Sequence, residues 1–180
     1  MSIRIVSWNV NGLRAVIRKE ALKDLVKLDA DVYCFQEVKA HQKDLDVDKI
    51  LEELSCKYYS INDTESKKGY SGVAVFSKLP IDSVRKEFGK KEFDHEGRIL
   101  IFEVAGISIY NIYFPNGKRN KERLDYKLDF TRACLDKVKA KNKTIVLGDF
   151  NTAYAEIDLA RPKENSKTSG FLIEERAVLD

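Results

Sequence analysis

Three apolar segments with the composition of buried β-strands each end in a side chain that can bind a cation. Asn9, Glu37 and Asp149 each follow directly on such a segment. A carboxylate among apolar strands is costly to bury unless it is paired or bound to a cation. Because open α/β sheets bind their ligands beyond the carboxyl ends of the strands, the three strand ends predict one shared metal site.

The ligands that these strand ends offer are all oxygen atoms. Asn151 adds an amide two residues after Asp149, and no Cys or His cluster lies nearby in the sequence. Carboxylate and amide oxygens suit Mg²⁺, with Mn²⁺ as the alternative, better than zinc. An Asp or Asn at a strand end also commonly makes a turn or caps the next helix. For any single position, a role in a turn or helix cap is as open an interpretation as a role as metal ligand.

The hydrophobic pattern predicts alternating strands and helices. Helices are expected at residues 18–28, at 48–54 and, from a stripe with Lys and Arg on its outer side, at 124–138. Strands are expected at residues 3–8, 32–35, 58–61, 72–76, 99–104, 107–114 and 144–147. The alternation favours an α/β fold, and the helix-poor middle favours antiparallel pairs, so we predict a mixed α/β sandwich.

The composition is that of an ordinary globular protein, with 43% hydrophobic and 34% charged residues. Without repeats or a Gly/Pro-rich linker, residues 1–180 are expected to form a single domain. A net charge of +3 is too mild to prove a polyanionic partner. Three cysteines without C-x-x-C spacing indicate neither a disulfide framework nor a zinc ribbon. A reducing compartment fits these cysteines best. No apolar run reaches about 18 residues, so we expect a cytoplasmic location and no membrane partner.

Short sequence blocks give the chain a specific resemblance. WNVNGLRA, QEVK, YFPN and GDFNTA stand at residues 8–15, 36–39, 113–116 and 148–153. EIDLA, GF and ER continue the series at residues 156–160, 170–171 and 175–176. In this order, over nearly the whole chain, the blocks resemble the exonuclease III branch of the Mg²⁺-dependent abasic-site endonucleases. A single block such as G-D-x-N recurs across the wider endonuclease, exonuclease and phosphatase superfamily.

The resemblance implies a fold and a set of metal ligands. It implies a layered α/β sandwich of two mixed β-sheets flanked by helices. Glu37 would be the principal ligand of Mg²⁺, with Asn9, Asp149 and Asn151 around it. Asn11 would support the ligands without binding the ion itself, although an Asn-Gly pair is also a common turn.

The resemblance also implies the groups that act on the scissile phosphate. Tyr113 and Asn116 would contact the phosphate, and Asp149 would align or deprotonate the attacking water. Asn151 would hydrogen-bond the phosphate oxygens as negative charge builds in the transition state. A Tyr that ends an apolar strand is otherwise a core residue with a solvated hydroxyl, and the Phe-Pro-Asn that follows Tyr113 favours the functional role.

Basic and amide side chains in expected loops are the candidates for contact with DNA. Lys118 and Arg119 directly follow the YFPN block, and Lys and Arg in loops can neutralise DNA phosphates. Arg161, Asn165 and Lys167 match a family loop that approaches the DNA. A solvated surface explains basic residues equally well. Asp94 and His95 are neighbours that cannot face one another as a relay, and the resemblance places them and Arg98 in a surface loop.

The implied activity is hydrolysis of the phosphodiester 5′ to an abasic site, with 3′–5′ exonuclease or 3′-end trimming. The implied partner is double-stranded DNA that carries abasic sites or 3′ ends. Family members continue with a tryptophan-containing strand and a Ser-Asp-His block, and we find neither here. One alternative is therefore a catalytically weak or inactive fragment, without the C-terminal strands, that binds metal or DNA and self-associates through exposed surfaces. A phosphatase of lipid or inositol substrates is the other.

Overall fold

The computed structural model describes residues 2–64, 69–139 and 143–180, and their contacts form two compact units. We call the first the sandwich unit; it runs to Tyr113 and includes strand β8, which ends at Asp149. We call the second the helical unit; it runs from Phe114 through helix α5 and takes in Phe150–Asp180. The single domain expected from the sequence stays a prediction.

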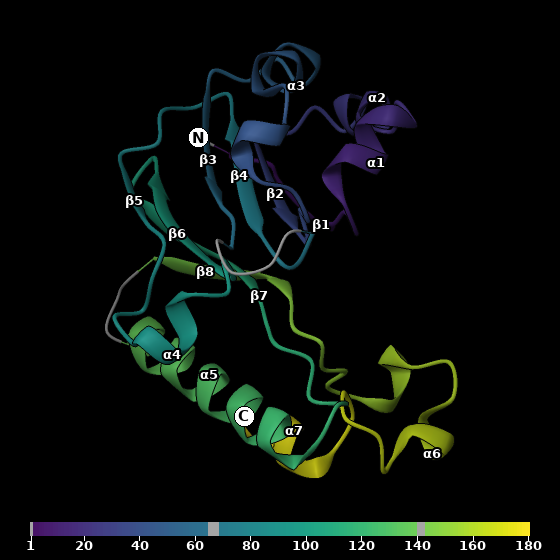
Figure 1. The fold of residues 1–180 in the computed structure, drawn as a ribbon. Coiled ribbons are helices and arrows are strands. Elements are labelled where there is room, and N and C mark those ends of the chain that lie inside the picture. Colours follow the sequence, from purple (N-terminus) through teal and green to yellow (C-terminus); the bar gives the residue numbers. More distant parts are fainter. Residues whose placement is uncertain (1, 65–68, 140–142) are drawn as a thin grey trace. The chain divides into compact units, whose positions relative to one another are not determined.

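Two four-stranded mixed sheets build the sandwich unit (Figure 1). The first, in the order β1-β2-β4-β3, contains β1 Ile5–Asn9, β2 Val32–Gln36, β3 Tyr58–Asn62 and β4 Val73–Ser77. The second, in sequence order, contains β5 Ser83–Arg85, β6 Ile99–Val104, β7 Ile107–Tyr113 and β8 Thr144–Asp149. Only the β1/β2 and β7/β8 pairs are parallel among these strands. The predicted mixed sandwich is confirmed.

The helices are short except for one. The sandwich unit has α1 Leu13–Arg18, α2 Leu22–Val26, α3 Val47–Glu53, α4 Lys91–Asp94 and the 3₁₀ turn η1 Gln42–Asp44. The helical unit has α5 Lys121–Lys139, α6 Pro162–Asn165, α7 Ile173–Ala177 and the 3₁₀ turn η2 Glu156–Asp158. The single helix predicted at residues 18–28 is wrong. Glu20, at φ 56°, lies in the left-handed region, where a helix commonly ends, and it separates α1 from α2.

Both faces of the first sheet are buried. Its inner face forms one apolar cluster with the second sheet, built from Val32, Cys34, Val73, Val75, Leu100, Phe102, Val104 and Ile109. Its outer face packs on α1, α2 and α3, where Leu13, Leu22 and Ile50 meet Phe35 and Phe76 (Figure 1). This double burial explains why β2 and β4 are buried at every position and do not alternate between apolar and polar residues.

The parallel pair β7/β8 requires a glycine one residue before Asp149. Gly148 lies opposite Ile112 in the register and has φ +134°. A Cβ built on Gly148 would stand 1.9 Å from the Ile112 carbonyl oxygen. This oxygen belongs to the backbone of a central strand, so it cannot rotate away as a side chain would. The close approach fixes β8 against β7 where both strands reach the candidate site.

Gly148→Ala is expected to lower the free energy of unfolding by more than Gly106→Ala. Gly106, in the β6–β7 turn, has φ +76° and nothing within 4 Å of a built Cβ. Both substitutions carry the strain of an L-residue at positive φ, on the order of 1–3 kcal/mol. Only the first also displaces a strand backbone. Urea unfolding of the two variants measures the difference, and equal losses would show that β7 accommodates the added methyl group.

Cys34, Cys56 and Cys134 are buried thiols. Burial raises the pKa of Cys34, and it raises the pKa of Cys56 to about 11 and that of Cys134 to about 12. All three are therefore uncharged at neutral pH.

Within the described ranges, no helix has the length and apolar character that a membrane crossing requires. The cytoplasmic location stays a prediction.

Candidate active site

The two parallel strand pairs bring their carboxyl ends to one place in the sandwich unit. Asn9 pairs with Gln36, so Glu37 follows one residue beyond, and Tyr113 pairs with Asp149. The Asn9 Nδ2 atom donates to Glu37 Oε1 at 3.0 Å and to Asp149 Oδ2 at 2.6 Å. One amide thus joins two carboxylates that come from different sheets. The geometry brings together Asn9, Glu37 and Asp149, as their strand ends suggested.

The Asn9 amide has a defined orientation. Its Oδ1 accepts a hydrogen bond from the Asn11 backbone N–H at 2.9 Å, so its nitrogen faces the carboxylates. In this arrangement Asn9 acts as a donor that holds Glu37 and Asp149 together. The predicted role of Asn9 as an oxygen ligand requires the amide to turn, and it stays a prediction. Asn11 adopts φ 44° behind Asn9.

A lysine ammonium group supplies a cation among these oxygens. Lys39 Nζ lies 2.5 Å from Glu37 Oε2 and 2.5 Å from Asn11 Oδ1. The oxygens of Glu37 and Asn11 therefore accommodate a positive charge. No group of three or more His, Cys, Asp or Glu side chains within the described ranges is placed to hold a metal. Two carboxylates with neighbouring amides fit Mg²⁺, which keeps several waters and takes one or two protein carboxylates.

Glu37 is held in a strained backbone conformation. It has φ 52°, a left-handed conformation that costs free energy and recurs at functional sites. The backbone N–H groups of Val38 and Lys39 donate to Gly72 O and Ser71 O and fix this loop. Burial acts to raise the pKa of the Glu37 carboxyl, but hydrogen bonds from Lys39, Asn9 and Tyr113 outweigh it and lower the pKa. Glu37 is therefore a carboxylate at neutral pH.

Tyr113 is positioned by a buried arginine. The Arg98 guanidinium lies 4.6 Å from the Tyr113 ring centroid, and Nη1 donates to the Tyr113 carbonyl at 3.1 Å. Nη2 donates to the Tyr70 hydroxyl at 2.7 Å, and Glu96 pairs with Nε. Burial, followed by the hydrogen bond to Glu37, raises the pKa of Tyr113, so its hydroxyl stays protonated. The expected surface position of Arg98 is wrong, because its side chain is only 2% exposed.

Two buried amides link the sheets beneath the site. Gln36 Nε2 donates to Asn111 Oδ1 at 2.7 Å. Asn111 Nδ2 donates to the carbonyls of Phe35 and Ala74 at 3.3 and 2.9 Å. We did not identify this bridge from the sequence. The available signal was an amide within each of the apolar strands β2 and β7, because a buried amide requires partners.

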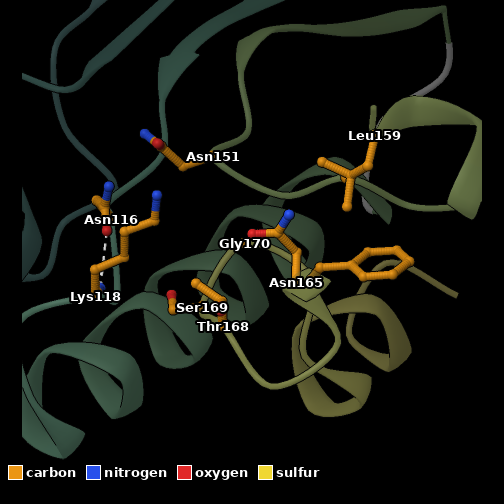
Figure 2. Close-up of a pocket in the computed structure, with 10 residues that line it drawn as sticks. Asn116, Lys118, Asn151, Leu159, Asn165, Thr168, Ser169 and Gly170 are labelled. Atoms are coloured by element: carbon orange, nitrogen blue, oxygen red, sulfur yellow. Dashed lines mark hydrogen bonds between the residues drawn. The ribbon is translucent and has the colours of Figure 1, made fainter. Parts of the chain in front are cut away.

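The helical unit contains a pocket of about 210 Å³ (Figure 2). Four residues predicted from the sequence line it: Asn116, Lys118, Asn151 and Asn165. The other lining residues are Ala153, Leu159, Thr168, Ser169, Gly170 and Phe171. Asn116, Lys118 and Asn151 lie on one side, Leu159 lies on the other, and Asn165 lies between them (Figure 2). The pocket therefore combines donors with an apolar wall.

Local hydrogen bonds orient the amides of this pocket. Asn116 Oδ1 accepts from the Lys118 backbone N–H at 2.8 Å, which leaves the Asn116 nitrogen as the donor end. Asn151 Nδ2 donates to Phe114 O at 2.9 Å, and Asn165 Nδ2 donates to Arg161 O at 2.8 Å. Asn151 belongs to the helical unit, whereas Asp149 belongs to the sandwich unit. A shared metal for Asn151 and Glu37 stays a prediction.

Three predicted DNA-binding residues do not line the pocket. Arg119, Arg161 and Lys167 are exposed, and Arg161 Nη1 lies 3.6 Å from Glu164 Oε2. A contact of these side chains with DNA stays a prediction. His95 is also exposed, with Nδ1 3.1 Å from Lys91 O.

Lys127 was expected on the outer, solvated side of the long helix, and this is wrong. Its side chain is 2% exposed and its Nζ lies 2.7 Å from Glu175 Oε1. Burial acts to raise the pKa of Glu175, but Lys127, Ser169 and the Gly170 N–H outweigh it and lower the pKa. A lysine in a helical sequence pattern does not by itself indicate that a carboxylate partner lies on the buried face of the helix.

The lowered pKa of Glu175 predicts a contribution to acid sensitivity. A carboxyl whose folded pKa lies below its ordinary value of 4.5 stabilises the fold above that pH, and the stabilisation is lost as pH falls through the folded pKa. The free energy of unfolding should therefore fall below about pH 4.5, and less steeply in Glu175→Gln. Urea unfolding between pH 3 and pH 7 measures it, with the exposed Glu164→Gln as control. Parallel pH profiles for the parent chain and Glu175→Gln would contradict the expectation.

Residues 6–177 match the Endonuclease/Exonuclease/phosphatase family. The chain belongs to this family. It is 39% identical over 178 residues to an exodeoxyribonuclease of Bacillus subtilis, and 41% identical over 180 residues to the DNA repair nuclease APEX1 of Danio rerio. Each match covers 97% of the chain. The resemblance to exonuclease III and the abasic-site endonucleases is thereby confirmed.

The fold also matches that of a solved structure. An AP endonuclease from Archaeoglobus fulgidus superposes with a TM-score of 0.85 at 22% identity, over 98% of this chain and 68% of that protein. The chain spans 68% of the length of the Bacillus subtilis protein and 57% of that of the Danio rerio protein. These relatives are nucleases by name, and the enzyme class they share is phosphodiester hydrolase.

Proposed function

We propose that the chain is a Mg²⁺-dependent DNA repair nuclease. Its reaction is hydrolysis of the phosphodiester 5′ to an abasic site in double-stranded DNA, and the same chemistry trims 3′ ends. The observation that carries the proposal is the bridge from Asn9 to Glu37 and Asp149 beside Tyr113. It places two carboxylates and a protonated hydroxyl together in a chain whose relatives are DNA nucleases.

Glu37 and Asp149 are the residues that would hold Mg²⁺, with Mn²⁺ as the alternative ion. Their charge and the ammonium group already bound at Glu37 support this assignment. A bound Mg²⁺ supplies a positive charge that polarises the phosphate and lowers the pKa of water. The Asn9 amide keeps the two carboxylates together, which would otherwise repel one another.

Three side chains would act on the phosphate and the attacking water. The Asp149 carboxylate orients the water and accepts its proton. The Tyr113 hydroxyl keeps its proton and donates a hydrogen bond toward the charge that builds on the phosphate. The Asn151 amide carries two N–H groups, and we assign it as a further donor to the phosphate oxygens.

The pocket of the helical unit would bind the DNA backbone. Lys118 supplies a positive charge, and Asn116 presents its amide nitrogen as a donor. Donors of this kind fix the register of a protein on DNA through its phosphates. Arg119, Arg161, Asn165 and Lys167 would extend this contact along the duplex.

A duplex with one tetrahydrofuran abasic analogue tests the proposal. In Mg²⁺, we expect a single nick 5′ to the analogue that leaves a 3′-hydroxyl, and no nick in EDTA or in the undamaged duplex. Duplex binding without a nick under all conditions would favour the inactive fragment. Release of inorganic phosphate from inositol phosphates without a nick would favour the phosphatase.

A further inference from the structure

A buried ion pair lies behind the pocket of the helical unit. Lys127 of α5 and Glu175 of α7 are each 2% exposed. Lys127 Nζ donates to Glu175 Oε1 at 2.7 Å and to the backbone carbonyl of Asn151 at 2.6 Å. The pair therefore reaches directly to a residue that lines the pocket. Asn151 has φ 48°, a conformation that persists only where the surroundings fix it.

Glu175 fixes the opposite part of the pocket wall. Its Oε1 accepts from Ser169 Oγ at 2.8 Å, and its Oε2 accepts from the backbone N–H groups of Gly170 and Leu172 at 2.6 and 3.0 Å. Ser169 and Gly170 line the pocket. One carboxylate thus organises the turn that carries them.

The two wall segments are also joined to each other. The Ala153 backbone N–H donates to Gly170 O at 2.8 Å, so the segment after Asn151 runs against the turn that Glu175 holds. A Cβ on Gly170 would lie 3.4 Å from Asn151 O, so the approach leaves little free space. Any shift of Lys127 or Glu175 would therefore reach both wall segments.

Stability alone is a weak reason for such a pair. Removing two charges from water costs free energy that the mutual attraction repays only with good geometry and additional hydrogen bonds. Apolar replacements of buried pairs often leave stability unchanged or higher. What the pair supplies here is a fixed position for a backbone carbonyl, a hydroxyl and two N–H groups.

We propose that Lys127 and Glu175 are positioning residues that hold Asn151 and the turn at Ser169 and Gly170 in place to receive a DNA phosphate group. The inference rests on the proposed function, because the pocket is the one to which we assign the DNA backbone. The pair acts through Asn151 and the turn and does not itself touch the substrate.

The variant that tests the role is Lys127→Met combined with Glu175→Gln. It removes both charges, so neither is left buried without its partner. The matched control is Arg132→Met with Asp129→Asn, which removes an exposed pair of the same helix joined at 2.9 Å. Lys127→Arg is the conservative variant, because a guanidinium can donate to Asn151 O and Glu175 at the same time. All measurements are made at a temperature at which circular dichroism and urea unfolding show that every variant is folded.

Two functional measurements separate positioning from stability. The first is the single-turnover nicking rate at saturating abasic duplex, and the second is the affinity for that duplex in EDTA. We expect the double variant to lose roughly 100-fold in the saturated rate, as small displacements of reacting groups commonly cause. The exposed-pair control and Lys127→Arg should retain the parent rate within about threefold, since an exposed pair contributes little and the guanidinium keeps the charge.

A readout independent of activity is the NMR signal of the Asn151 side-chain amide. It should shift in the folded double variant and stay in place in the control. An unshifted signal with an unchanged rate and affinity would overturn the proposal. If the parent chain binds the duplex but does not nick it, the proposed function fails, and the EDTA affinity and the Asn151 signal still decide the positioning role. A parent chain that neither binds nor nicks the duplex would count against both.

Discussion

Asp149→Asn should slow the nicking of an abasic duplex by about 100- to 1000-fold at saturating duplex and Mg²⁺. The substitution keeps the shape of the side chain but removes its negative charge and its capacity to accept a proton from water. It also replaces the acceptor of the 2.6 Å hydrogen bond from Asn9 Nδ2. The saturated single-turnover rate measures the loss, because it excludes differences in DNA affinity.

Asp24→Asn provides the control for that loss. Asp24 is an exposed carboxylate whose pair with Lys27 spans 2.7 Å on the surface of α2. Exposed pairs of this kind contribute little to stability, so the control should nick at the parent rate. An Asp149→Asn chain that nicks within a few-fold of the parent would remove Asp149 from the reaction.

Glu37→Ala should abolish saturable binding of Mg²⁺. The parent site offers two carboxylates and neighbouring amides, and such a site keeps several waters on the ion, so we expect an affinity on the order of millimolar. Without Glu37, one carboxylate remains, and the Lys39 ammonium loses its carboxylate partner at 2.5 Å. Both changes disfavour a cation at this place. Isothermal calorimetry with MgCl₂ in a metal-free buffer measures the affinity directly.

Glu20→Ala is the control for the metal measurement. Glu20 is exposed and pairs with Lys23 at 2.9 Å, away from the strand ends. The substitution Glu20→Ala also removes one glutamate carboxylate, but it leaves the candidate site unchanged. Its Mg²⁺ titration should therefore match that of the parent chain. Equal affinities for Glu37→Ala and the parent chain would refute the ligand assignment, whatever the effect on nicking.

The strands could be predicted from the sequence because their burial is simple. Strand β2 is buried along its whole length, and β6 and β7 are buried at almost every position, so their apolar runs need no information about partners. Strand β5 escaped prediction because all three of its residues are exposed. The boundary between α1 and α2 depends on Glu20 at φ 56°, which no hydrophobic pattern records.

Candidate site residues could be predicted where a polar group ends an apolar strand, as at Asn9, Glu37 and Asp149. The groups that orient them could not, because their partners are distant in sequence. Gln36 meets Asn111 across 75 positions, and Lys127 meets Glu175 across 48. Residue type alone predicts that a lysine in a helix is exposed. Only the position of its carboxylate partner shows that Lys127 is buried.

The buried thiols allow the local unfolding of each unit to be measured separately. Cys34 lies in the apolar cluster between the two sheets of the sandwich unit, whereas Cys134 lies on α5 of the helical unit. A thiol that is buried and protonated reacts with an alkylating reagent only after local unfolding exposes it, because the thiolate is the nucleophile. Mass spectrometry that resolves the two modified peptides over time would therefore give separate opening free energies for the unit that holds the carboxylates and the unit that holds the pocket.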